Sequence, residues 1–285
     1  MSDIRTFALE ELSAMIELNG ETTKLPLQSL PDRYVDWIED GRKSMYDHLL
    51  GKENSVPFFS QHLPVLVTQG DSENFPFNCC NKGVGMIPKA EHLEELSDLF
   101  RTTLEKTRDK PPADSIRERI EAVSKFYFDR DKIDLRALST LEIFQRKTFE
   151  NLSSRPFASL LFTGSYPRYT SFQLNCAVEI LQPDDPRHTF IQLARNMFER
   201  DRFHITQDAF PNAYIFWISE VIDKTPFKVV KSEKHQSRAG SAGERVPAPK
   251  CPYSQDPPPA GGPGPARVDE PSPMGFQMGG RDDEL

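Results

Sequence analysis

The sequence predicts an α+β fold whose centre is a sheet of antiparallel strands. Residues 157–162 form a continuous apolar run between Pro156 and Gly164, which is typical of a strand buried on both faces. Residues 170–180 alternate apolar and polar side chains, which is typical of a half-buried strand. The intervening segment contains Gly164 and Pro167, residues that suit a hairpin loop. These two strands are therefore expected to pair.

The N-terminal part, residues 1–52, is predicted to be helical. Apolar residues recur at helical spacing over residues 6–18, and Asn19-Gly20 provides a helix end. A second helix is expected over residues 31–50, because Pro31 suits a first helical turn and apolar residues again recur at helical spacing.

The next segment, residues 53–230, is predicted to hold the sheet. Strands are expected over 56–69 and 74–87, joined by a polar turn, and strand-like residues return over 125–144. The last strand is expected over 213–223.

Helices are predicted to interrupt this sheet. An insertion over residues 88–125 holds a helix over 90–108 and a shorter one over about 115–124, with Asp114 as its N-cap. A further helix is expected from Asp184 to about Phe198. Residues 231–285 are rich in Pro and Gly, so a disordered C-terminal tail is predicted.

Composition limits the function. The 285 residues, 37% hydrophobic, suffice for one sizeable domain with appendages. A net charge of -8 argues against a nucleic-acid partner, and the short apolar runs argue against a membrane span. The acidic residues near the N-terminus favour a cytoplasmic protein, and we interpret the final Asp282-Asp283-Glu284-Leu285 as a coincidental likeness to a retrieval signal.

No metal site is expected from the cysteines and histidines. Cys79 and Cys80 are adjacent, so on a strand their side chains point to opposite faces. The histidines also lack the spacing of metal ligands.

The stretch from Phe144 to Ile180 resembles the FMN-binding split barrel of the pyridoxamine 5'-phosphate oxidase superfamily. A basic pair opens a short helical turn, a leucine and an Arg-Pro break follow, and a buried strand then leads to its hairpin partner. The resemblance implies an antiparallel split β-barrel, FMN as cofactor and a homodimer with the flavin between subunits. The matching residues are Arg146, Lys147, Leu152, Arg155-Pro156, 157–162 and 171–180.

The resemblance also implies site residues. Arg146, Lys147 and Thr148 would bind the FMN phosphate, because a guanidinium holds phosphate oxygens in a fork and an ammonium adds a point charge. Ser171 and Gln173 would lie near the isoalloxazine or ribityl part. The alternative is that Arg146 and Lys147 are two solvated residues at a helix start.

The chain departs from the oxidase itself. It lacks the upstream strand of alternating Arg and Lys and the closing Arg-Leu-Ala-Pro, so a vitamin B6 activity is not expected. Cys176 stands where the family often has Gly. Three functions remain open: an FMN-dependent oxidoreductase of a small molecule, a non-catalytic flavin- or haem-binding protein, and a dimeric interaction protein.

Overall fold

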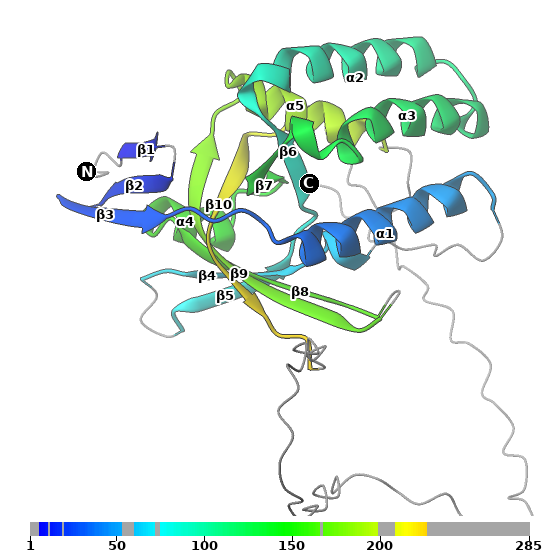
Figure 1. Cartoon of the computed structure of the whole chain (residues 1–285). Coiled ribbons are helices and arrows are strands. Elements are labelled where there is room, and N and C mark those ends of the chain that lie inside the picture. The colour runs from blue at the N-terminus through cyan, green and yellow to red at the C-terminus, as the bar shows by residue number, and fades with distance from the viewer. Residues whose placement is uncertain are drawn as a thin grey trace, which may run out of the picture. The chain divides into compact units, whose positions relative to one another are not determined.

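The computed structural model describes residues 6–10, 12–18, 20–52, 60–71, 75–165, 168–198 and 209–226. All of these belong to a compact unit, residues 1–230 (Figure 1). The predicted tail over 231–285 lies outside the described residues, as do residues 56–59 of the first predicted strand.

The centre of the fold is a seven-stranded antiparallel sheet with the order β5-β4-β8-β9-β10-β7-β6. The α+β class with an antiparallel sheet is thereby confirmed. Its strands are β4 (Val65–Gln69), β5 (Phe77–Asn81), β6 (Gly85–Pro88), β7 (Ile133–Glu142), β8 (Phe157–Gly164), β9 (Thr170–Leu181) and β10 (Asn212–Asp223).

The predicted hairpin is β8 and β9, which pair from Phe157 opposite Ala177 to Gly164 opposite Thr170. β8 is not buried on both faces, however. Its residues alternate between buried and exposed, and Phe157 and Leu161 each remain 36% exposed. The apolar run was misleading because only one face of β8 lines the core.

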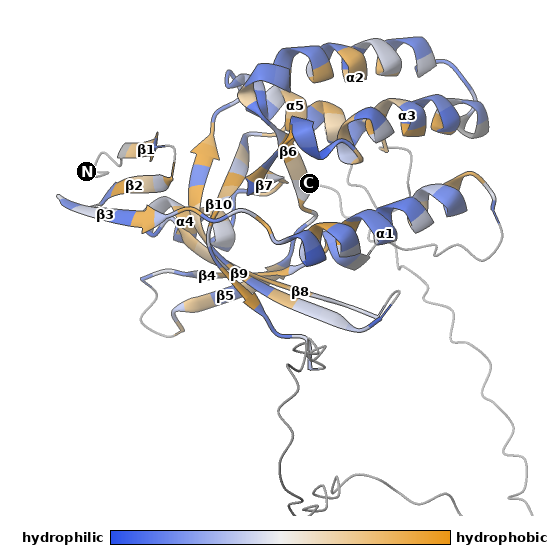
Figure 2. Cartoon of the chain, in the orientation of Figure 1, coloured by the Kyte–Doolittle hydropathy of each residue, from blue (hydrophilic) through white to orange (hydrophobic). Residues whose placement is uncertain are grey.

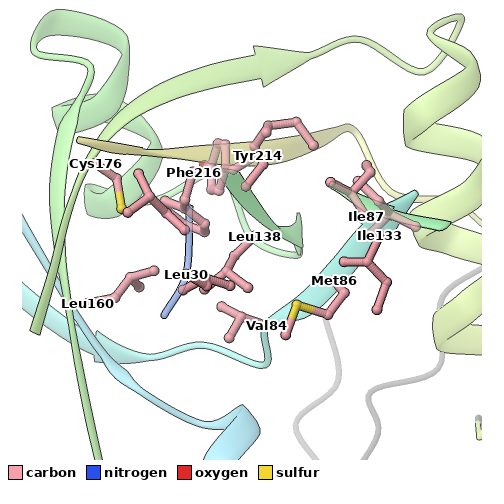
Figure 3. Packing of buried hydrophobic residues seen from close by; sticks show 14 of the residues in the cluster. Leu30, Val84, Met86, Ile87, Ile133, Leu138, Leu160, Cys176, Tyr214 and Phe216 are labelled. Atoms are coloured by element: carbon pink, nitrogen blue, oxygen red, sulfur yellow. The ribbon is translucent and has the colours of Figure 1, made fainter. Parts of the chain in front are cut away.

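The strands curl around a common apolar interior. Leu160, Cys176, Phe216, Leu138 and Met86 come from β8, β9, β10, β7 and β6 and lie around one core (Figure 3). A sheet whose strands all contribute one face to the same interior, while β5 and β6 remain its two edges, is an open barrel. This agrees with the split barrel implied by residues 144–180.

The hydrogen-bond register shifts once between β9 and β10. Ile218 lies opposite Cys176, but Glu220 lies opposite Asn175. The extra residue is a β-bulge at Ser219, and it changes which side chains of β10 face the core.

Helix α1 (Asp32–Leu49) matches the prediction for residues 31–50 and packs against the barrel. The Tyr34 ring meets Phe162 and Phe172 edge to face, with centroids 5.3 Å apart in both pairs. Figure 2 shows mostly hydrophilic residues along α1, with separate apolar patches. The remaining helices are α2 (Leu93–Thr107), α3 (Pro112–Tyr127), α4 (Lys147–Ser154) and α5 (Pro186–Asn196), with short 3₁₀ turns at Ser60–His62, Ala90–His92 and Arg130–Lys132.

The predicted helical insertion is present as α2 and α3, which lie beside α5 (Figure 1). The Phe126 ring packs against Phe100 and Phe190, so α3 continues through the residues that were expected to start a strand. The expected N-cap, Asp114, is also wrong, since α3 begins earlier, after Pro111.

The helix expected over residues 6–18 is wrong. The segment forms β1 (Thr6–Glu10) and β2 (Ser13–Leu18), which build a three-stranded sheet with β3 (Glu21–Pro26). Ala14 and Ile16 are fully buried, whereas Met15 between them is half-buried and Glu17 is exposed, so burial follows a period of two. In so short a segment helical and strand periods overlap, and pairing decides between them. Of the two helices predicted in the N-terminal segment, the one over residues 31–50 is present as α1, and the one over residues 6–18 is replaced by strands.

The prediction of one strand over 74–87 is also wrong, because this segment forms two strands on opposite edges of the sheet. β5 pairs with β4, whereas β6 pairs with β7. In the segment expected to be the first strand, the described residues begin with a 3₁₀ turn at Ser60–His62, and the strand itself starts at Val65.

Candidate functional site

The segment from Glu142 to Lys147, called here the basic turn, connects β7 to α4. Its residues Phe144, Gln145, Arg146 and Lys147 are exposed. As predicted, the basic pair opens a short helix: Arg146 is the N-cap residue, and its side chain makes no capping hydrogen bond to α4. The positive end of the helix dipole is thus left for water or an external anion.

The carboxylate of Glu142 anchors the basic turn to the barrel. One oxygen, Oε1, accepts hydrogen bonds from the backbone N–H groups of Phe144 at 2.9 Å and Gln145 at 3.0 Å. The other, Oε2, accepts from Lys82 Nζ and from the Tyr214 hydroxyl, both at 2.8 Å. Glu142 is only 2% exposed, so each of these bonds compensates for the burial of its charge.

The protonation of Glu142 is set by these partners. Burial would raise the pKa of its carboxyl, but the Lys82 ammonium and the hydrogen bonds from Phe144 and Tyr214 hold that pKa below its ordinary value. Burial and the neighbouring carboxylate raise the pKa of Tyr214. Glu142 is therefore an ionised acceptor and Tyr214 a neutral donor at neutral pH.

The backbone of the basic turn is strained at Gln145. Its φ of 46° lies in the left-handed region, and among the described residues no other non-glycine has a positive φ. The Gln145 side chain donates from Nε2 to Asn212 Oδ1 at 2.7 Å, and Asn212 Nδ2 in turn donates to the Leu181 carbonyl at 3.2 Å. These bonds hold a conformation that the residue alone would rarely adopt.

The two basic side chains reach the surface. The Arg146 guanidinium lies 5.3 Å from the centroid of the Phe144 ring, and Lys147 Nζ lies 3.7 Å from the Glu150 carboxylate. An exposed ion pair of this kind contributes little energy and exchanges readily for another anion.

Thr148, the third predicted phosphate ligand, is buried and faces β5. Its hydroxyl accepts from Asn78 Nδ2 at 3.0 Å and lies 3.4 Å from the sulfur of Cys80. Asn151, one turn later, donates to Thr68 Oγ1 at 3.1 Å. Thr148 thus attaches α4 to the sheet, and a phosphate contact would require this arrangement to change.

Ser171 and Gln173 lie near the start of β9. The N–H of Ser171 donates to Thr225 Oγ1 at 3.2 Å, and Gln173 Nε2 donates to Asn175 Oδ1 at 2.9 Å. Both residues share a face of the sheet with Asn175, which is opposite the face that carries the core residues.

Within one chain the five predicted residues do not form one site. Helix α4 packs on the core side of β4 and β5, whereas Gln173 points to the other side. Leu141, next to the basic turn, aligns through Ala213 with Leu181 at the far end of β9. Gln173 precedes Leu181 by eight residues, roughly 26 Å along a strand. Arg146 and Lys147 therefore lie apart from Ser171 and Gln173.

The residues that shape the basic turn were missed by the sequence prediction. Lys82 and Tyr214 are 60 and 72 positions from Glu142 along the chain, and no local pattern joins them. A slight signal was present: Glu142 lies on the same strand face as the apolar Leu138, and a carboxylate that becomes buried there requires a partner.

A partly apolar surface, called here the outer face, covers β5, β4, β8 and β9 on the side away from the core. Cross-strand pairing places Cys79, Val67, Ser159 and Asn175 in one row, and the hydrogen-bonded Ser159, Asn175 and Glu220 make this row polar. The apolar residues on either side of the row, each at least 36% exposed, are Val65, Phe77, Phe157 and Leu161.

The described residues bring together no group of three or more His, Cys, Asp or Glu that could hold a metal ion. None of the described helices is long and apolar enough to cross a membrane.

Comparison with known proteins finds likeness among solved structures only. No family model and no curated protein matches the chain. HupZ from Group A Streptococcus is 10% identical with a TM-score of 0.35, covering 69% of this chain and 95% of its own. An FMN-binding protein from Syntrophomonas wolfei is 10% identical with a TM-score of 0.34, covering 67% of this chain and 95% of its own.

A candidate pyridoxamine 5'-phosphate oxidase from Lactobacillus delbrueckii is 14% identical with a TM-score of 0.31, covering 68% of this chain and 93% of its own. The names of these two proteins, an FMN-binding protein and a candidate pyridoxamine 5'-phosphate oxidase, match the superfamily that residues 144–180 resemble. At these TM-scores the likeness carries no argument about function.

Proposed function

We propose that this protein binds FMN and acts as a homodimeric, flavin-dependent oxidoreductase on a small molecule in the cytoplasm. The observation that carries the proposal is the basic turn, where an exposed guanidinium and ammonium flank the uncapped N-terminus of an α-helix. A phosphate dianion fits this set of donors, because the helix N-terminus, Arg146 and Lys147 all favour negative charge.

The flavin ring needs a second set of residues, which one chain does not bring to the basic turn. In the proposal, the outer face of a second copy supplies it through Ser171 and Gln173, and the site is complete only in the dimer. Exposed Phe157 and Leu161 favour such an assembly, since covering them removes apolar surface from water.

In this arrangement the residues of the chain bind and orient the flavin. Arg146 and Lys147 hold the phosphate, the side-chain amide of Gln173 offers hydrogen bonds to the polar edge of the ring, and the outer faces exclude water from it. The bound flavin supplies the electron transfer. The net charge of -8 favours small-molecule partners over nucleic acid.

Fluorescence titration of the purified protein with FMN tests the proposal. The double variant Arg146→Ala/Lys147→Ala should weaken binding on the order of a hundredfold or more, because two charge-assisted hydrogen bonds are lost. The matched control is Arg117→Ala/Lys125→Ala, which removes two exposed charges from α3 and should bind as the wild type does.

The absorption spectrum separates the alternatives. A flavin spectrum supports the proposal, and a haem Soret band favours the haem-binding alternative. A colourless dimer that does not take up FMN would favour an interaction protein whose outer face serves assembly alone.

A further inference from the structure

We infer that Glu142 is a positioning residue for the basic turn: it acts through the backbone N–H groups of Phe144 and Gln145 to fix where Arg146 and Lys147 are presented. The role of these two residues in binding FMN rests on the proposed function. That Glu142 fixes the turn is independent of the proposed function.

The two oxygens of the Glu142 carboxylate have different partners, which supports this inference. Oε1 serves the turn, through two N–H groups at 2.9 and 3.0 Å, and Oε2 serves the barrel, through Lys82 and Tyr214 at 2.8 Å. Glu142 therefore joins the exposed turn to Tyr214 on the buried part of β10 and to Lys82, which directly follows β5. A carboxylate can do this because it accepts on both oxygens.

Arg146 and Lys147 depend on this backbone for their position. Their side chains contact Phe144 and Glu150, which are themselves exposed and belong to the turn and to α4. The positive φ of Gln145 turns the chain just before the pair. Such a conformation persists only when its surroundings impose it, and here the Glu142 carboxylate and the Gln145–Asn212 bond do so together. Release of the two N–H groups removes the first of these restraints and should let the turn relax.

Glu142→Gln separates the two halves of the anchor. A neutral amide has a single acceptor oxygen, so it can serve either the turn or Lys82 and Tyr214, and its NH₂ group must face donors on the other side. The matched control is Glu179→Gln. Glu179 accepts from Arg187 and from Trp217 Nε1 at 2.7 to 2.9 Å on the opposite face of the sheet, so it has a comparable network without contact to the turn.

The test combines amide hydrogen exchange of the full chain with FMN titration. Without ligand, Glu142→Gln should speed exchange at Phe144 and Gln145 by about tenfold or more, and Glu179→Gln should leave these two amides unchanged. FMN affinity should fall about tenfold in Glu142→Gln and show no further fall when Arg146 and Lys147 are already alanine.

The outcomes distinguish the inference from the proposed function. Faster exchange in a chain that binds no FMN would support the anchoring role and refute the FMN proposal. Unchanged exchange would overturn the inference, as would an equal loss of affinity with and without Arg146 and Lys147. If Glu142→Gln does not fold, Tyr214→Phe removes one hydrogen bond to Oε2 and keeps the ring, and faster exchange at the same amides is again expected.

Discussion

Gly70, in the loop after β4, lies against the side chain of Asn151 on α4, so Gly70→Ala should destabilise the folded chain. An added Cβ would overlap Asn151 Oδ1 and lie 2.7 Å from its Cγ. Asn151 is 1% exposed and donates to Thr68 Oγ1 at 3.1 Å, so its side chain cannot move away without breaking a buried bond. The contact is one of those that hold α4 on the sheet.

The size of the effect follows from two costs. Forcing a methyl group into a packed site costs about 1 to 3 kcal/mol. Leaving the Asn151 amide without its partner costs a further 1 to 3 kcal/mol or so. Because a shift of Asn151 relieves part of the first cost while incurring the second, we expect the free energy of unfolding to fall by roughly 2 to 4 kcal/mol.

Urea unfolding followed by circular dichroism measures this change. Gly83→Ala is the matched control, because its added Cβ would meet nothing closer than 3.8 Å. In Asn151→Ala the obstructing side chain is absent, so Gly70→Ala should cost much less in that background. A Gly70→Ala chain as stable as the wild type, or one equally destabilised in both backgrounds, would refute the reasoning.

Four further outcomes are expected. Arg146→Ala/Lys147→Ala should lose FMN affinity while far-ultraviolet circular dichroism stays unchanged, since neither side chain fills the core; equal affinity would show a solvated surface pair. Leu161→Asp, which puts a charge on the outer face, should turn the proposed homodimer into a monomer in sedimentation at micromolar concentration; a variant that still sediments as a dimer would show that the outer face does not form the contact. The pKa of Glu142 is below its ordinary value of 4.5, so the folded state binds fewer protons than the unfolded state. The free energy of unfolding of the wild type should therefore fall faster than that of Glu142→Gln as the pH falls from about 5 to 3. Parallel curves of unfolding free energy against pH would contradict this. Deleting residues 231–285 should leave the melting temperature and FMN binding unchanged, because the Pro- and Gly-rich composition cannot bury enough apolar surface; a large drop would overturn this.

The sequence predicts well where local signals set the ends of an element. Pro156 directly precedes β8 and Gly164 ends it, and Asp185 caps α5 by accepting from the Arg187 N–H at 2.8 Å. It predicts poorly where distant pairing decides. The segment over 6–18 has apolar residues compatible with both periods, and the 74–87 segment is divided between two partners that its own residues do not reveal.

The candidate site divides in the same way. Arg146 and Lys147 at a helix start could be found from their neighbours along the chain. Ser171 and Gln173 could be placed on β9, but not on the face away from α4, because that depends on how the whole sheet curls. Glu142 and its partners are joined only by the folded barrel, so no window of the sequence contains the site.

The adjacent thiols Cys79 and Cys80 give this chain two native chemical reporters. Cys79 is exposed on the outer face, while Cys80 is partly buried beneath α4 beside Thr148. The alkylation rate of Cys79 will follow whatever covers the outer face, and that of Cys80 will follow detachment of α4. Because the two thiols sit on opposite sides of one strand, peptide mapping of a single labelled sample reads assembly and local opening separately, without an introduced probe.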